Sequence, residues 1–125
     1  MQWIQTLTLD EARPMVERAI KASANAGCAV SVAICDEAGN LVLFERMCGA
    51  RSHTIELACQ KARLSAQIGI PTAILAAAGK GDVLAGGMPI LVDGKSVGSI
   101  GVSGATPDQD GSIAEAAIES LLARP

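Results

Sequence analysis

Aromatic side chains are almost absent from this sequence of 125 residues, which contains Trp3, Phe44 and no tyrosine. Proteins that read single-stranded nucleic acids stack the bases on aromatic rings, so this composition disfavours such a function. The formal net charge is −3, from 10 Lys and Arg against 13 Asp and Glu. An acidic chain also lacks the basic footprint of proteins that bind nucleic acids or anionic membranes. We therefore predict no nucleic-acid partner and no membrane partner.

Long apolar runs and closely paired cysteines are missing as well. No run of 18 apolar residues occurs, so the sequence predicts no membrane-spanning helix. Asp10 and Glu11 lie where a signal peptide would be apolar. None of the cysteines has C-x-x-C spacing, which disfavours a zinc site or a thioredoxin-like pair. The four are Cys28, Cys35, Cys48 and Cys59. We expect a cytoplasmic protein whose thiols are reduced and mostly buried.

Small aliphatic residues dominate what is present. Half of the residues are hydrophobic and 18% are charged, a composition that excludes a disordered chain. The length suits one domain over residues 1–125. Because a small and strongly apolar chain would expose apolar patches as a monomer, we expect a homo-oligomer, a dimer or larger.

Hydrophobic periodicity predicts two β-hairpins with helices around them. The predicted helices cover residues 8–27, 52–67, 71–79 and 107–122. The predicted strands cover residues 28–35, 41–46, 86–92 and 95–104. Two hairpins with helices outside favour an antiparallel sheet and the α+β class, because a doubly wound parallel sheet needs alternating strands and helices.

Individual residues have predicted places at the ends and faces of these helices. Thr8 and Glu11 have the spacing of a capping box for the first helix. Asp108 and Asp110 lie where they would cap the last helix and complement its dipole. The helical spacing of the second helix places Lys61 on its outer face.

Glycines mark further features of the second hairpin. Asp93-Gly94 between two apolar runs is a strong signal for a tight turn. Gly98 and Gly101 within the strand indicate the close approach of another backbone or of a ligand.

Five segments in order resemble one known family. They are D-E-A-G-N-L-V-L-F-E-R-M-C-G-A (36–50), K-A-R (61–63), G-G-M-P-I (86–90), D-G-K-S-V-G-S-I-G-V-S-G (93–104) and D-x-D (108–110). Together they resemble the GlcG/HbpS haem-binding-protein-like family, which also occurs as the C-terminal domain of some corrinoid adenosyltransferases. The resemblance implies a five-stranded antiparallel sheet with packed helices, a profilin-like sandwich, and assembly into dimers or larger oligomers. It implies haem binding for some members. Cys48 departs from the Asp usual in the family, and the stretch between Ile70 and Gly86 is short.

His53 is the single histidine and lies in the first turn of the predicted second helix. Its imidazole has three possible roles. It could be an axial ligand of haem, for which histidine is the usual proximal residue. It could be a general base, or a solvated residue without a chemical role.

Other candidate residues surround the same loop or lie in the glycine-rich segment. Arg46 and Arg51 could bind a carboxylate or a haem propionate, or remain solvated or bridge subunits. Cys48 could pair with His53 as a nucleophile or serve as a second haem ligand. Gly86 and Gly87 could turn backbone N–H groups toward a small anion, or allow tight packing. The predicted cofactor site consists of these five residues and His53.

The sequence thus predicts an oligomeric domain that binds a small molecule or cofactor, with haem held by His53 as the first hypothesis. One alternative is an accessory lyase or isomerase of small organic-acid catabolism, with His53 as general base and Arg46 or Arg51 as the carboxylate anchor. Another is a structural oligomer without a ligand. No metal site beyond haem is predicted.

Overall fold

Two β-hairpins and four helices make up the described part of the chain. The computed structural model describes residues 6–79, 81 and 83–123. The elements are α1 (Leu9–Asn25), β1 (Ser31–Asp36), β2 (Leu41–Arg46), α2 (His53–Ile68), α3 (Thr72–Ala77), β3 (Gly87–Val92), β4 (Lys95–Ser103) and α4 (Pro107–Leu122). Their order agrees with the predicted one, and the α+β class with an antiparallel sheet is confirmed.

The sheet has four strands, so the five strands implied by the resemblance are wrong for the described residues. The strand order is β2-β1-β4-β3 with every neighbouring pair antiparallel. The segment before α1 touches the sheet where the N–H of Leu7 donates to the carbonyl of Val97 at 3.0 Å. A strand needs a ladder of such bonds, and Leu7 is not assigned to one.

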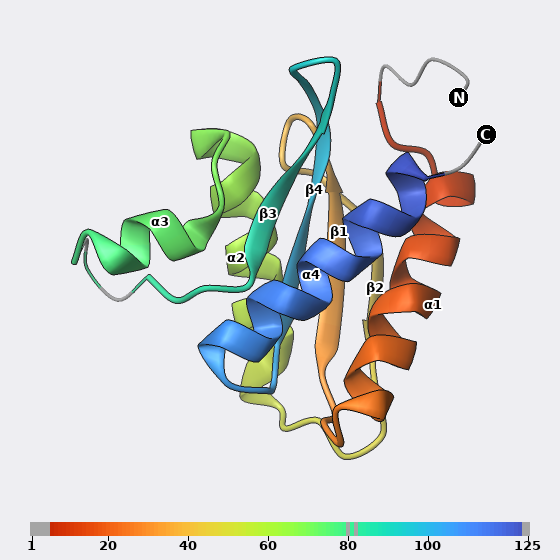
Figure 1. Ribbon diagram of the computed structural model, residues 1–125, viewed down its shortest axis with the longest axis vertical. Coiled ribbons are helices and arrows are strands. Elements are labelled where there is room, and N and C mark those ends of the chain that lie inside the picture. The colour runs from red at the N-terminus through yellow and green to blue at the C-terminus, as the bar shows by residue number, and fades with distance from the viewer. Residues whose placement is uncertain (1–5, 80, 82, 124–125) are drawn as a thin grey trace.

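Helices cover both faces of the sheet. In Figure 1, α1 and α4 lie side by side on the near face, and α2 lies behind the strands. Side chains alternate accordingly along β1. Val32 and Ile34 join the large core under α1 and α4, whereas Ala33 and Cys35 join a smaller cluster under α2.

Small residues on β4 bring the α2 backbone unusually near to the sheet. A Cβ atom added at Gly101 would lie 2.1 Å from the carbonyl oxygen of Ala58 in α2. Two residues earlier, the hydroxyl of Ser99 donates to the carbonyl of Ala62 at 2.6 Å. The close backbone approach predicted from Gly101 is thus made by α2.

Both hairpin turns follow from local chemistry. Asp93 and Gly94 have φ values of 52° and 77°, the left-handed conformations that a two-residue type I′ turn requires. In the other hairpin, the carboxylate of Asp36 accepts the N–H groups of Ala38 and Asn40 at 3.0 and 2.9 Å. These bonds hold the pKa of Asp36 below its usual value, the bond from Asn40 most of all.

The helix caps differ from the prediction. Thr106, rather than either predicted aspartate, caps α4 in a reciprocal capping box with Gln109. The hydroxyl of Thr8 bonds to the carboxylate of Glu11 and not to the backbone, so no side chain caps α1. Asp110 is buried inside the fold.

Exposure of the thiols also departs from expectation. Cys35 is buried, Cys28 and Cys59 are half-buried, and Cys48 is exposed, so the expectation of mostly buried thiols is wrong. Within residues 6–79, 81 and 83–123, no helix has the length and apolar character needed to cross a membrane.

Candidate functional site

Three connections meet at one end of the sheet and enclose a pocket of about 560 Å³. Ser31 at the start of β1 pairs with Ser103 at the end of β4 and with Arg46 at the end of β2. The segments that enter β1, leave β4 and leave β2 therefore lie together, at the lower end of the molecule in Figure 1. The first turns of α2 and α4 complete the pocket walls.

His53 is the first residue of α2 and lines this pocket together with Arg51. Both side chains are exposed. The amino end of α2 has no side-chain cap, because the side chain of Ser52 makes no hydrogen bond to the first turn. The N–H groups of Thr54 and Ile55 donate to the carbonyls of Arg51 and Ser52 at 3.0 and 3.2 Å, and the helix start carries a partial positive charge. This side of the pocket is therefore electropositive.

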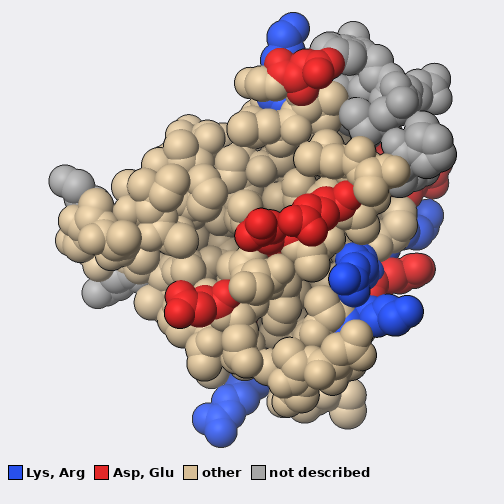
Figure 2. Space-filling model, viewed as in Figure 1, with Lys and Arg blue, Asp and Glu red and all other residues tan. Residues whose placement is uncertain are grey.

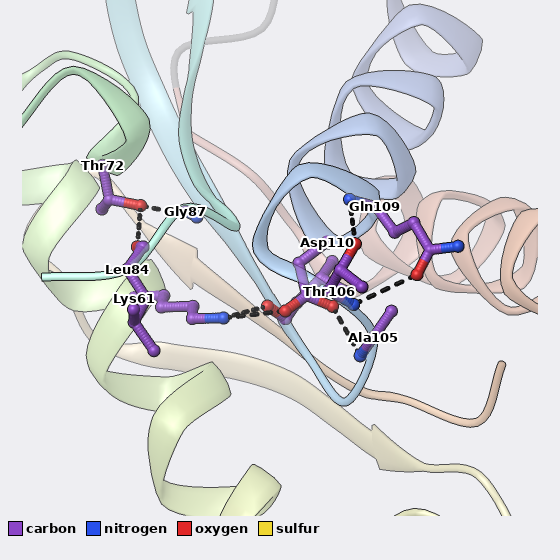
Figure 3. A network of polar contacts seen from close by, with 9 residues as sticks. Lys61, Thr72, Leu84, Gly87, Ala105, Thr106, Gln109 and Asp110 are labelled. Atoms are coloured by element: carbon purple, nitrogen blue, oxygen red, sulfur yellow. Dashed lines mark hydrogen bonds and ion pairs between the residues drawn. The ribbon is translucent and has the colours of Figure 1, made fainter. Parts of the chain in front are cut away.

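A buried ion pair forms another wall of the pocket. Lys61 reaches from α2 past the end of β4 to Asp110 in α4, as Figure 3 shows. Its ammonium donates to the carboxylate oxygen Oδ2 of Asp110 at 3.1 Å and to the carbonyl of Val102 at 2.8 Å. Only 5% of Lys61 and 3% of Asp110 is exposed. The pair joins α2, β4 and α4 behind the pocket.

Burial and hydrogen bonding have opposite effects on the pKa of Asp110. Burial raises its pKa above the usual carboxyl value, against the lowering effects of the Ala105 N–H and of Lys61. The second carboxylate oxygen, Oδ1, accepts the N–H of Ala105 at 2.9 Å. Both oxygens of Asp110 therefore already have donors within the fold.

Gly86 and Gly87 make room for Lys61. A Cβ atom at Gly86 would lie 2.4 Å from the carbonyl oxygen of Val102 and 2.9 Å from the Lys61 ammonium nitrogen. A Cβ atom at Gly87 would lie 2.3 Å from the Lys61 carbonyl oxygen. Both glycines are buried and line a separate pocket of about 340 Å³ beside α3 and α4. A cofactor contact by these glycines stays a prediction, and the observed packing gives them a structural reason.

Two more of the predicted site residues, like Gly86 and Gly87, do not line the pocket of His53. Arg46 ends β2, and its guanidinium donates to the carbonyl of Ala50 at 3.1 Å. Cys48 is exposed in the following loop. Neither lines the large pocket, whereas Cys28 does. The structure thus brings together His53, Arg51 and Cys28.

Sequence reasoning misses the two buried charged residues of the site. The predicted place of Lys61 on the outer face of its helix is wrong, because the residue lies on the buried stripe. That stripe has a spacing of four, three and four residues and consists of Thr54, Ala58, Lys61 and Ser65. A lysine at such a spacing, between small residues, is the signal that could have found it. The predicted cap role of Asp110 is also wrong, and only the tertiary contact with Lys61 reveals its place.

The site is suited to a ligand with negative charge. Its polar side chains include an imidazole, a guanidinium, an ammonium and a thiol, and Asp110 is the one carboxylate among the described lining residues. In the described part of the chain, no three His, Cys, Asp or Glu side chains gather as a multidentate metal site.

The fold and this pocket define a small α+β domain in which an antiparallel sheet is packed between helices. The sequence model of the family described as "Haem degrading protein HbpS-like" matches residues 7–119. The chain belongs to this HbpS-like family, as its motifs indicated.

Solved structures agree with this membership. The Klebsiella pneumoniae protein ORFY is 25% identical, covers 100% of this chain and 97% of its own, and has a TM-score of 0.91. A double mutant of HbpS from Streptomyces reticuli is 32% identical over 97% of this chain and 90% of its own, with a TM-score of 0.85. A PduOC–haem complex is 25% identical over 92% of this chain and 94% of its own, with a TM-score of 0.82.

Proposed function

We propose that this protein binds haem in the pocket of about 560 Å³, with His53 as the axial ligand of the iron. The position of His53 carries the proposal, because the chain's single histidine is exposed and lines this pocket. Histidine is the usual proximal ligand of haem iron. The family description and the similarity to a PduOC–haem complex support the same ligand.

The residues present fit this cofactor. Ligand pockets span roughly 300–1,000 Å³, and this one lies within that range. The guanidinium of Arg51 is placed to bind a propionate carboxylate, for which a planar fork of donors is well matched. Bound haem would supply a redox-active iron, and the protein would supply its ligand and its charge partners.

Catalysis by His53 as a general base has less support. A catalytic base is normally oriented by a second group, and no hydrogen bond to the His53 ring is found among the described residues. Without such a bond, the ring nitrogens of His53 are available to bind a ligand. The lyase or isomerase activity, the ligand-free structural role and self-association remain predictions.

Haemin titration followed by Soret absorbance tests the proposal. We expect a saturable 1:1 change for the natural protein and its loss in His53→Ala. Arg51→Ala should weaken binding, whereas Arg46→Ala should not, because Arg46 lies outside the pocket. Cys48→Ser is a matched control for the exposed thiol. Equal binding by the natural protein and His53→Ala would overturn the assignment of the ligand.

A further inference from the structure

We propose that the same pocket holds a carboxylate-binding subsite, in which the Lys61 ammonium binds the carboxylate group and the amino end of α2 adds positive potential to the pocket. The inference deepens the proposed function because it uses the same pocket, but it does not depend on haem or on ligation by His53. It assigns a ligand chemistry to a buried residue that the sequence placed on the surface.

The ammonium of Lys61 has bonding capacity to spare. A lysine ammonium carries three N–H donors. Among the described residues, two of them are used, by Asp110 and by the carbonyl of Val102. The lysine is nearly buried, yet it lines the pocket. A carboxylate in the pocket would supply an acceptor for the third N–H of the ammonium.

Burial of this ion pair is difficult to explain by stability alone. Apolar residues of similar volume often stabilise a fold as well as a buried ion pair does, or better, because two ions must be desolvated. The chain nevertheless uses Gly86 to make space beside the Lys61 ammonium, and Gly87 to make space for the backbone of α2 at Lys61. A binding role gives the buried ammonium a function that an apolar residue could not perform.

The charges around the pocket favour an anion. Among the described lining residues, Arg51 and Lys61 contribute two positive charges and Asp110 one negative charge, a sum of +1 with His53 neutral, whereas the whole chain carries −3. Both oxygens of Asp110 already accept hydrogen bonds. Acidic side chains instead lie along the exposed face of α4, where Figure 2 shows them. The pocket is therefore a locally basic place on an acidic protein.

The amino end of α2 reinforces this preference independently of Lys61. The two helices that begin at the pocket differ in their amino-terminal caps. A capping box of Thr106 and Gln109 caps α4, whereas no side chain caps α2. The start of this 16-residue helix carries the partial positive charge of the helix dipole, which favours an anion in the pocket. The helix start and the buried ammonium thus favour the same chemical group.

Two kinds of ligand carry this group, namely a free organic acid and the propionates of haem. Succinate is the probe for the first, by isothermal titration calorimetry at low ionic strength. Haemin compared with haemin dimethyl ester, in which the carboxylates are blocked, is the probe for the second.

Three variants isolate the role of Lys61. Asp110→Asn keeps an acceptor for the Ala105 N–H but removes the charge that neutralises the ammonium, so we expect carboxylate affinity to rise several-fold. Lys61→Met with Asp110→Asn removes the ammonium without leaving a buried carboxylate, and should lower the affinity at least tenfold relative to Asp110→Asn. Arg46→Ala, outside the pocket, should bind like the natural protein. Circular dichroism and urea unfolding verify that each variant is folded.

The outcomes separate this inference from the haem proposal. Succinate binding that depends on Lys61 supports the subsite, even if haemin fails to bind. Preference for haemin over its dimethyl ester, lost in the double variant, supports it through the propionates. If neither probe distinguishes Asp110→Asn from the double variant, Lys61 binds no carboxylate and the inference is wrong, whatever His53 does. A dimethyl ester that binds as tightly as haemin, together with no succinate binding, would likewise overturn it.

Discussion

The ammonium of Lys61 lies 3.1 Å from the carboxylate of Asp110, although 49 residues separate the two along the chain. The contact connects α2 with α4 across the end of β4, where the candidate pocket opens. Each charge is removed from water and depends on the other for compensation. The pair therefore connects α2 with α4 and also lines the candidate pocket.

Removing one member of this pair should be more harmful than removing both charges. Lys61→Met leaves the carboxylate of Asp110 buried without its cation, and breaking a buried pair in this way costs about 3–5 kcal/mol. The double variant with Asp110→Asn should recover a substantial part of the lost free energy of unfolding. Urea unfolding measures both. Equal losses in the single and double variants would show that the charge pairing is unimportant.

Two glycines should respond to alanine in opposite directions. Gly101→Ala would force a Cβ atom against the carbonyl of Ala58 in α2, so we expect a loss of about 3 kcal/mol or more from overpacking. Gly111 lies within α4, and a Cβ atom there meets nothing within 4 Å. Gly111→Ala should stabilise the protein by about 0.5–1 kcal/mol. Thermal unfolding compares the two, and a tolerated Gly101→Ala would contradict the observed packing of α2.

The two threonines that precede helices should differ in importance. Thr106→Ala removes a side-chain bond to the Gln109 N–H, and loss of such a cap costs about 1 kcal/mol. Thr8→Ala removes only a contact with the Glu11 side chain, so the cost should stay within about 0.5 kcal/mol, as at ordinary surface sites. Chemical denaturation of the pair provides the comparison. A larger loss at Thr8 would show that it, too, caps its helix.

Alkaline pH should weaken the protein through Cys35. Burial raises the pKa of this thiol from 9.0 to about 11. A raised folded-state pKa means that the thiol's contribution is complete below pH 9, where both states are protonated. It is lost as the pH rises toward 11, because the unfolded thiol ionises first. With about 1.4 kcal/mol for each pKa unit, the free energy of unfolding should fall by about 2–3 kcal/mol over this range.

Cys35→Ala is the control for this pH dependence, because it removes the thiol and leaves the other titrating groups in place. The difference in stability between the natural protein and the variant should shrink between pH 9 and pH 11. A difference that stays constant over this range would show that Cys35 is not buried as a neutral thiol.

Local patterns are sufficient for most of the architecture. Helices and hairpins follow from periodicity and turn residues over a few positions, so the Asp93-Gly94 turn and the order of elements could be predicted from the sequence. The place of His53 at the start of a helix also follows from local sequence, and the pocket lies at this helix start. The close backbone approach at Gly101 could be predicted as well, although its partner could not.

The sequence by itself determined the elements, the family and the helix-start position of His53. Tertiary structure alone decided that Arg51 lines the pocket and Arg46 does not, and that Cys28 lies there in place of Cys48. It also turned Lys61 inward and gave the described sheet four strands. The physical reason is range: a periodic pattern describes the faces of one element, whereas a pocket and a buried ion pair form where distant segments meet.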